Sequence, residues 1–250
     1  MQCGKLDRHG IYEMMISEGT SNRSIYLLHP GRKIEAILFD MDGVLVDSIP
    51  LHIKAWNSVL SEINLPVLDR EIYLSVLGRT NMEMITRYLD LQNIPLPLSF
   101  RRDIVDTKEQ FFRDSIKDYI DTTPGVLDWL DFFRKKQIPC SVASSGEMAN
   151  IVVVLEMLHI SDYFTSIISG AHLSASKPDP TIFKLAAASL GVKPDNCMVI
   201  EDAPVGIQAA KSANMISCAL ATTFSSDKLK QADLFLENLA QAHPETLFSD

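Results

Sequence analysis

Basic residues, cysteines and long apolar runs are all scarce in this 250-residue sequence. Its 23 basic residues against 32 acidic ones give a net charge of −9, which argues against a nucleic acid or an anionic membrane as partner. No apolar run approaches the length of a membrane-spanning helix. The sequence has no CxxC pair, and its four cysteines fit a reducing compartment better than a disulfide framework; they are Cys3, Cys140, Cys197 and Cys218. We therefore expect a cytoplasmic protein with no nucleic-acid and no membrane partner, and we favour a monomer.

With 46% hydrophobic and 22% charged residues, the chain has the composition of a globular protein with a substantial core. Residues 1–33 contain several glycines and only weak periodicity, so we expect a poorly ordered N-terminal extension there. Beyond it, a change of pattern divides the chain into an α/β core, residues 34–49 and 119–250, and an all-helical insertion, residues 50–118.

The stretch from Ile34 to Ser48 organises the rest of the chain. An apolar run over residues 34–39 is typical of a strand buried on both faces, and Asp40, Met41, Asp42 and Gly43 follow it directly. Alternate residues of an extended chain point the same way, so Asp40 and Asp42 share one face at the strand's end. Two adjacent carboxylates repel unless a cation or a shared proton intervenes, and oxygen ligands suit Mg²⁺. Taken alone, this motif fits a polar turn equally well.

Periodicity predicts only helices in residues 50–118 and alternating helices and strands after Thr123. The expected helices are residues 50–60, 71–76, 81–89, 100–116, 126–136, 148–158, 181–190 and 205–212. The expected later strands are residues 139–143, 166–169, 198–200, 216–220 and 234–236. We expect Asp179 to cap the helix that Pro180 begins. Alternating units of this kind predict a parallel sheet covered by helices on both faces, with ligands bound at the carboxyl ends of the strands.

Polar residues follow three further strands at the same predicted edge of the sheet. Ser144, Ser145 and Gly146 stand between a strand and a helix, where free backbone N–H groups bind anions. Lys177 lies in the loop before another helix, and Glu201-Asp202 ends a strand. Each has a simpler reading: a serine cap, a surface lysine and solvated turn acids. Two acidic pairs, a hydroxyl and a lysine at four such ends together favour an active site.

The motifs D-M-D-G-V-L-V-D-S, V-A-S-S-G, S-K-P-D-P and E-D-A-P-V-G-I-Q-A-A resemble, in order, the four motifs of the haloacid dehalogenase-like hydrolase superfamily. The resemblance covers residues 34–236. The helical insertion is similar to the small cap of the subfamily that contains β-phosphoglucomutase, phosphoglycolate phosphatase and sugar-phosphate phosphatases. The resemblance implies a Rossmann-like parallel sheet with an all-helical cap domain inserted after the first strand.

The resemblance also implies a role for each motif residue. Asp40 is expected to be the nucleophile that forms an aspartyl-phosphate, and Asp42 the general acid and base. Ser144 and Lys177 are expected to hold the phosphoryl oxygens. The implied Mg²⁺ ligands are Asp40, the backbone carbonyl of Asp42, Glu201 and Asp202. Asp42 argues against a dehalogenase, because the halide-removing members lack this acid and the metal.

Two features of the insertion bear on the choice between a phosphatase and a phosphomutase. Mutases resemble one another in a lysine just before the cap-loop glycine and an arginine three residues after it, which hold a distal phosphate. Here those positions are Leu77 and Asn81, although Arg79 offers a cation from a shifted position. His52 resembles a mutase histidine that couples cap closure to acid–base chemistry; a packing pair with Trp56 on one helix face is the alternative.

The sequence therefore predicts a Mg²⁺-dependent phosphatase that acts on a small phosphomonoester such as a sugar phosphate. A β-phosphoglucomutase-type mutase is the alternative, and a non-catalytic binding protein on the same fold is a third. The expected substrate-binding residues are His52, Arg79, Thr80, Asn81, Ser145 and Gly146.

Overall fold

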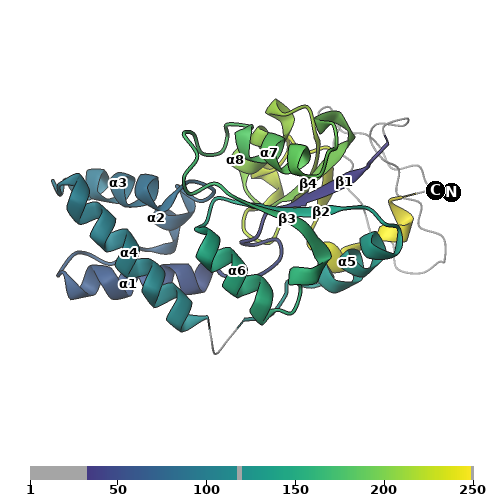
Figure 1. The fold of residues 1–250 in the computed structure, drawn as a ribbon. Helices are drawn as coiled ribbons and strands as arrows, with labels where there is room; N and C mark the ends of the chain where they lie inside the picture. The colour runs from purple at the N-terminus through teal and green to yellow at the C-terminus, as the bar shows by residue number, and fades with distance from the viewer. Residues whose placement is uncertain (1–32, 117–119, 249–250) are drawn as a thin grey trace.

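The computed structural model describes residues 33–116 and 120–248. Its centre is a six-stranded, all-parallel sheet in the order β3-β2-β1-β4-β5-β6 (Figure 1). The strands are β1 Ala36–Phe39, β2 Cys140–Ser144, β3 Phe164–Ser169, β4 Cys197–Glu201, β5 Ile216–Leu220 and β6 Leu234–Leu236. Strand β1 lies in the middle, with Ile37 in register with Cys140 on one side and Met198 on the other. The first motif therefore ends at the centre of the sheet's carboxyl edge.

Helices cover both faces of the sheet, as the alternating pattern predicts. Helices α7 and α8 lie on one face and α5 and α6 on the other (Figure 1). Their bounds are α5 Val126–Lys135, α6 Met148–Met157, α7 Thr181–Ser189 and α8 Pro204–Ser212. Alternate residues of β1 explain this layering, because Ala36 and Leu38 pack against α7 and α8 whereas Ile37 and Phe39 belong to the cluster beneath α5 and α6.

The insertion between β1 and β2 is helical and packs beside the sheet (Figure 1). It consists of α1 Ile49–Glu62, α2 Arg70–Leu74, α3 Asn81–Gln92 and α4 Leu98–Ser115. These helices enclose an apolar cluster of their own, which includes Trp56, Leu60 and Ile85. The predicted Rossmann-like core with a helical cap after the first strand is confirmed. The domain boundaries at residues 49/50 and 118/119 stay a prediction.

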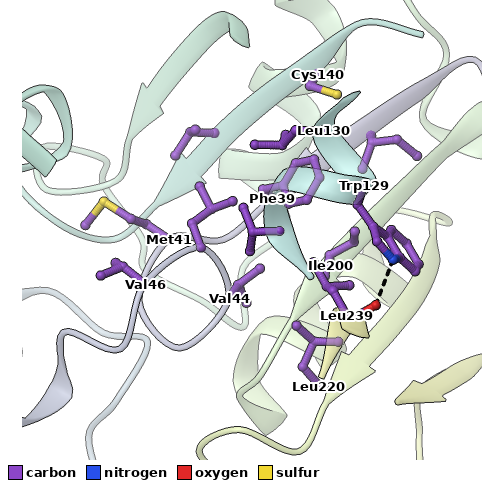
Figure 2. Close-up of a cluster of buried hydrophobic side chains, with 14 of the residues drawn as sticks. Phe39, Met41, Val44, Val46, Trp129, Leu130, Cys140, Ile200, Leu220 and Leu239 are labelled. Atoms are coloured by element: carbon purple, nitrogen blue, oxygen red, sulfur yellow. Dashed lines mark hydrogen bonds between the residues drawn. The ribbon is translucent and has the colours of Figure 1, made fainter. Parts of the chain in front are cut away.

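The loop after β1 is fixed by the core beneath it. Met41, Val44 and Val46 are buried near Phe39 (Figure 2). The carbonyl of Met41 accepts hydrogen bonds from the backbone N–H groups of Val44 and Val46. On the far side of the cluster, Trp129 Nε1 donates to the carbonyl of Leu239 at 2.9 Å (Figure 2). Asp40 and Asp42 therefore project from a rigidly packed turn.

The main differences from the predicted elements lie at their ends. Strand β3 begins at Phe164 rather than at residue 166, and α4 begins at Leu98 rather than at residue 100. Asp179 does accept a hydrogen bond from the Thr181 N–H, at 2.9 Å, but the residue at the N-cap position is Pro180. Five short 3₁₀ helices complete the described chain: Ser161–Tyr163, Pro194–Asn196, Ser226–Lys228, Leu239–Gln241 and Pro244–Thr246.

The predicted N-terminal extension lies outside the described residues apart from Lys33. Among the helices of residues 33–116 and 120–248, none combines the length and apolarity needed to cross a bilayer.

Candidate active site

A cavity of about 50 Å³ lies between the carboxyl edge of the sheet and the helical cap. Asp40, Asp42, Glu201 and Asp202 line it from the sheet side. The cap contributes Tyr73, Val76, Leu77 and Met84, whose side chains form a largely apolar wall. It also contributes the polar His52, Arg79 and Asn81, together with Gly78. Ser145 and Gly146, two of the residues expected to bind substrate, also line the cavity. The sheet's carboxyl edge thus brings together the acidic residues of the first and fourth motifs.

Three of these carboxylates form a buried cluster suited to a divalent cation. Each of Asp40, Glu201 and Asp202 offers an oxygen, and these oxygens all lie within 4.8 Å of one another. Asp202 Oδ2 is buried without a hydrogen-bond partner among the described residues. Burial, and then the charges of Glu201 and Asp40, raise the pKa of Asp202 well above its usual range. Carboxylate oxygens are hard ligands, so this donor set fits Mg²⁺.

Lys177 is part of this cluster rather than a surface residue. Its Nζ lies 2.7 Å from Asp40 Oδ1 and 2.7 Å from Glu201 Oε1, and the residue is 2% exposed. Burial alone would lower the pKa of Lys177, but the two carboxylates outweigh burial and raise it above its usual value. The lysine therefore stays charged beside Asp40.

The backbone near Glu201 supports this arrangement. Glu201 Oε2 accepts hydrogen bonds of 2.8 Å from the N–H groups of Asp202 and Ala203. Gly206, in the first turn of α8, leaves the space for the other oxygen: a Cβ there would lie 1.8 Å from Glu201 Oε1. The glycine in the fourth motif is thus required by the close approach of helix and carboxylate.

Asp42 points away from the cluster, toward the cap. Ser48 Oγ donates a hydrogen bond to Asp42 Oδ1, and His52 Nε2 lies 3.3 Å from the same oxygen. Burial favours the neutral acid, but His52 and Ser48 outweigh it and lower the pKa of Asp42. The two acids of the first motif therefore differ in role: Asp40 faces the lysine, and Asp42 is bound by hydrogen-bonding groups.

His52 is held in place from both sides. Its ring stacks on Phe112 at 3.9 Å between centroids, and Lys108 Nζ lies 2.9 Å from Nδ1. A lysine ammonium only donates, so Nδ1 accepts and the ring proton resides on Nε2, facing Asp42. Burial, and then the charge of Lys108, lower the pKa of His52. The histidine is more than the predicted packing partner of Trp56.

Lys108 and Glu109 extend this network between the cap and the core. Lys108 Nζ lies 2.8 Å from Glu109 Oε1, and Asn81 Nδ2 donates to the same oxygen at 2.5 Å. The other oxygen of Glu109 accepts a hydrogen bond from Asn150 of the core helix α6. Asn150 Oδ1 in turn accepts from Arg113 Nη1 at 3.0 Å. A chain of polar contacts thus links Asp42 to helix α6 through helix α4.

Several predicted residues are engaged within the protein. Ser144 Oγ accepts a hydrogen bond from the Gly146 N–H at 3.1 Å, and Ser145 Oγ donates to the carbonyl of Gly78 on the cap at 2.7 Å. Thr80 caps helix α3 in a reciprocal pair with Glu83 and does not line the cavity. Arg79 lines the cavity and is exposed, with Nη1 3.9 Å from Glu83 Oε1. The predicted contacts of these residues with substrate stay predictions.

Sequence reasoning missed Tyr73, Lys108, Glu109 and Asn150. One signal was available for Lys108, because it follows Ile104 and Val105 and precedes Phe112 on the buried stripe of α4. A charged residue at an apolar position of an amphipathic helix requires a partner. Tyr73 resembles an ordinary core tyrosine in sequence, and nothing local marks it.

Comparison with known proteins agrees with this site. The family model described as haloacid dehalogenase-like hydrolase matches residues 37–220. A phosphorylated-carbohydrates phosphatase of Thermotoga maritima is 30% identical over 73% of this chain and 82% of its own length. A fructose-1-phosphate phosphatase of Escherichia coli is 31% identical over 72% and 92%. The crystal structure of β-phosphoglucomutase from Clostridium difficile matches with a TM-score of 0.77 and 30% identity, covering 83% of this chain and 92% of that one. The chain belongs to the haloacid dehalogenase-like hydrolase family.

Proposed function

We propose that this chain is a Mg²⁺-dependent phosphatase that hydrolyses a small phosphomonoester, in particular a sugar phosphate. The observation that carries the proposal is the buried cluster of Asp40, Lys177, Glu201 and Asp202 at one end of a cavity closed by the cap. Two relatives named as phosphatases of phosphorylated sugars support the hydrolytic reaction and the substrate class.

Mg²⁺ would be held by Asp40, Glu201, Asp202 and the backbone carbonyl of Asp42. When bound, the ion supplies positive charge that offsets the phosphoryl group and the ligating carboxylates. The unpartnered Oδ2 of Asp202 supports this assignment, because a buried anionic oxygen without a partner is costly.

The protein's own residues then perform the two steps. An oxygen of Asp40 attacks phosphorus, the bond to the leaving oxygen breaks, and Asp42 gives that oxygen a proton. Asp42 must take up this proton before the step, because His52 and Ser48 favour its anion. Asp42 next takes a proton from water, which attacks the phosphorus of the aspartyl-phosphate and frees Asp40 and inorganic phosphate. Lys177 and Ser144 offset charge on the phosphoryl oxygens. His52 holds the Asp42 carboxylate on the cap side, where the leaving group would lie.

A phosphomutase is the second candidate, favoured by the similarity to a solved β-phosphoglucomutase. A mutase must retain a bisphosphate, which needs cationic contacts for the distal phosphate. Among the described residues that line the cavity, Arg79 is the only lysine or arginine. Asn81 is uncharged and its amide N–H already donates to Glu109, so it does not replace a cationic contact. These features favour hydrolysis.

The deciding experiment supplies β-glucose 1-phosphate with Mg²⁺ and catalytic glucose 1,6-bisphosphate, and quantifies both possible products. Inorganic phosphate without glucose 6-phosphate establishes hydrolysis, and a panel of sugar phosphates then finds the preferred substrate. Glucose 6-phosphate without phosphate makes the chain a mutase. No phosphate release from any member of the panel supports a non-catalytic binding protein instead.

We also propose a cellular location, an oligomeric state and domain boundaries for the enzyme. The three cysteines in the described chain are buried and unpaired, which supports a cytoplasmic location. We propose a monomer built from a core of residues 34–49 and 119–250 and a cap of residues 50–118, whose partner is the small phosphorylated substrate.

A further inference from the structure

The apolar wall of the cavity contains one hydroxyl that the protein itself does not use. Tyr73, in helix α2, lines the cavity and is 8% exposed. Its hydroxyl forms no hydrogen bond with any residue in the described parts of the chain. Among the described residues, the polar side-chain atoms that are fully buried and lack a partner are Trp56 Nε1, Ser161 Oγ and Asp202 Oδ2, so the Tyr73 hydroxyl is not fully buried. The hydroxyl is therefore accessible from the cavity.

Arg79 aside, the uncharged polar side chains that line the cavity with Tyr73 are already engaged. Asn81 bonds to Glu109, and Asn150 bonds to Glu109 and Arg113. Ser145 donates its only hydroxyl proton to the Gly78 carbonyl. Tyr73 thus offers an uncommitted neutral donor beside the apolar Val76, Leu77 and Met84, and Arg79 is the charged donor of the same wall.

The position of Tyr73 places it on the leaving-group side of the site. Its ring lies 6.4 Å from that of His52 with 19° between the planes, and His52 contacts Asp42. Burial, and then the charges of Asp42 and Glu109, raise the pKa of Tyr73 well above its usual value, so the phenol stays neutral and donates.

We propose that Tyr73 donates a hydrogen bond to a hydroxyl or ether oxygen of the leaving group, and so selects phosphomonoesters of polyols over those of apolar alcohols. The proposal rests on the proposed function and specifies the chemistry of its substrate. A site that offers a buried donor rejects an analogue without the matching oxygen, because the donor loses water and gains no partner.

The test replaces Tyr73 by phenylalanine and compares two substrates: the best sugar phosphate of the panel and 4-nitrophenyl phosphate, whose ring has no hydroxyl near the ester. We expect kcat/KM for the sugar phosphate to fall roughly tenfold or more, and kcat/KM for 4-nitrophenyl phosphate to stay within about twofold. Equal losses on both substrates, or no loss on either, would overturn the proposal.

Tyr88→Phe is the matched control. Tyr88 lies in the same cap and its hydroxyl donates to the Pro66 carbonyl, away from the cavity lining. This variant should leave the ratio of the two kcat/KM values unchanged, even where it lowers stability. The far-UV circular dichroism of both variants checks that each is folded.

A measurement on the wild-type enzyme gives an independent test if Tyr73→Phe does not fold. Glycerol 3-phosphate and propyl phosphate have the same carbon chain with and without hydroxyls. We expect glycerol 3-phosphate to be hydrolysed with a kcat/KM roughly tenfold higher. Equal values overturn the assignment to Tyr73 while leaving the phosphatase intact, whereas no phosphate release from any ester refutes the proposed function itself.

Discussion

Asp40, Glu201 and Asp202 carry three negative charges when ionised, and Lys177 supplies one positive charge within 2.7 Å of two of them. The remaining charge of about −2 matches a divalent cation. Burial, opposed by Lys177 and reinforced by Glu201 and Asp42, raises the pKa of Asp40 to about 7. A bound Mg²⁺ would reverse this shift and keep Asp40 an anion, the form that the proposed attack on phosphorus requires.

Replacing Asp40 tests its proposed role as the nucleophile. Asp40→Asn preserves size and removes the attacking oxygen anion, so we expect no measurable phosphate release above background while thermal unfolding stays cooperative. Asp47→Asn is the control, because Asp47 lies on the same loop, carries the same charge and is exposed. Substantial residual turnover in Asp40→Asn, with wild-type activity in Asp47→Asn, would remove Asp40 from the nucleophilic role.

Residues at strand ends were predictable from sequence, and residues in the middle of helices were not. Asp40, Glu201 and Asp202 end or directly follow short apolar strands, where a charge is conspicuous and where topology brings strand ends together. Lys177 lies in the loop between β3 and α7 and was found through its motif. Lys108, Glu109 and Asn150 reach the site from α4 and α6, and their convergence depends on how the cap packs on the core.

At the scale of elements, helix α8 shows how a glycine in a helix makes room for a side chain of the site. Gly206 has no Cβ, and this lets the first turn of the helix pass close to Glu201. Alanine has a higher helix propensity than glycine, so any loss of Mg²⁺ affinity in Gly206→Ala must come from displacement of the Glu201 carboxylate.

Gly206→Ala is therefore predicted to weaken Mg²⁺ binding by roughly 10- to 100-fold, a range typical of disturbed support for a metal ligand. Isothermal titration calorimetry with Mg²⁺ measures this affinity directly. Gly191→Ala is the control, because a Cβ at Gly191 meets nothing within 4 Å. It should cost stability through its positive φ of 68° but leave Mg²⁺ affinity unchanged. Equal Mg²⁺ affinities in both variants would show that the close approach is irrelevant.

The order and type of the elements were predictable because βα alternation and helical spacing are local patterns. Their ends were less so: Phe164 joins strand β3 although its side of the sheet is only half-buried, and a register shift lies between Cys140 and Ser141 where β2 pairs with β3. Neither a half-buried edge strand nor a bulge changes the spacing of apolar residues in a way that the sequence reveals.

At the scale of the whole molecule, the cap is closed against the core. Ser176 Oγ donates to Glu83 Oε1 at 2.7 Å, and Ser145 bonds to the Gly78 carbonyl. The two connections between cap and core run side by side, because Val46 pairs with Thr122. Residues of the core and of the cap line the same cavity, so we expect substrate to enter when the cap opens about these connections.

Ser176→Ala removes one contact of the closed form and leaves the residues of the cavity in place. We expect kcat/KM to fall roughly 3- to 10-fold, since one hydrogen bond is lost, with kcat unchanged or higher if opening limits product release. Steady-state kinetics on the best sugar phosphate measures both values. Ser58→Ala, which removes an exposed hydroxyl bonded within its own helix, should match the wild type. A fall in kcat alone would contradict the role in closure.

The acidic cluster also predicts how stability depends on pH and metal. The folded, metal-free chain binds the Asp40 proton with a pKa of about 7, whereas an unfolded aspartate titrates near 4. Between these values the folded state holds more protons, so stability without metal falls as pH rises from about 4 to 7. Mg²⁺ needs the deprotonated ligands, so its stabilising effect grows over the same range.

Thermal unfolding with and without Mg²⁺ should therefore show a larger increase in Tm at about pH 7.5 than at about pH 5. Asp40→Asn should flatten the pH dependence of the metal-free protein. An increase that is the same at both pH values would show that these carboxylates do not bind the ion.

The separation of the cap's apolar cluster from those of the sheet has a consequence for the history of such a protein. The buried members of the cap cluster, among them Tyr73, Val76 and Met84, belong to none of the three clusters that include strand residues. Inherited changes confined to this cluster can therefore alter the cap's wall of the cavity with little effect on the packing beneath the acidic cluster. Substrate preference and reaction chemistry can then change largely separately during evolution. A new substrate can be acquired while the residues at the carboxyl edge of the sheet stay the same.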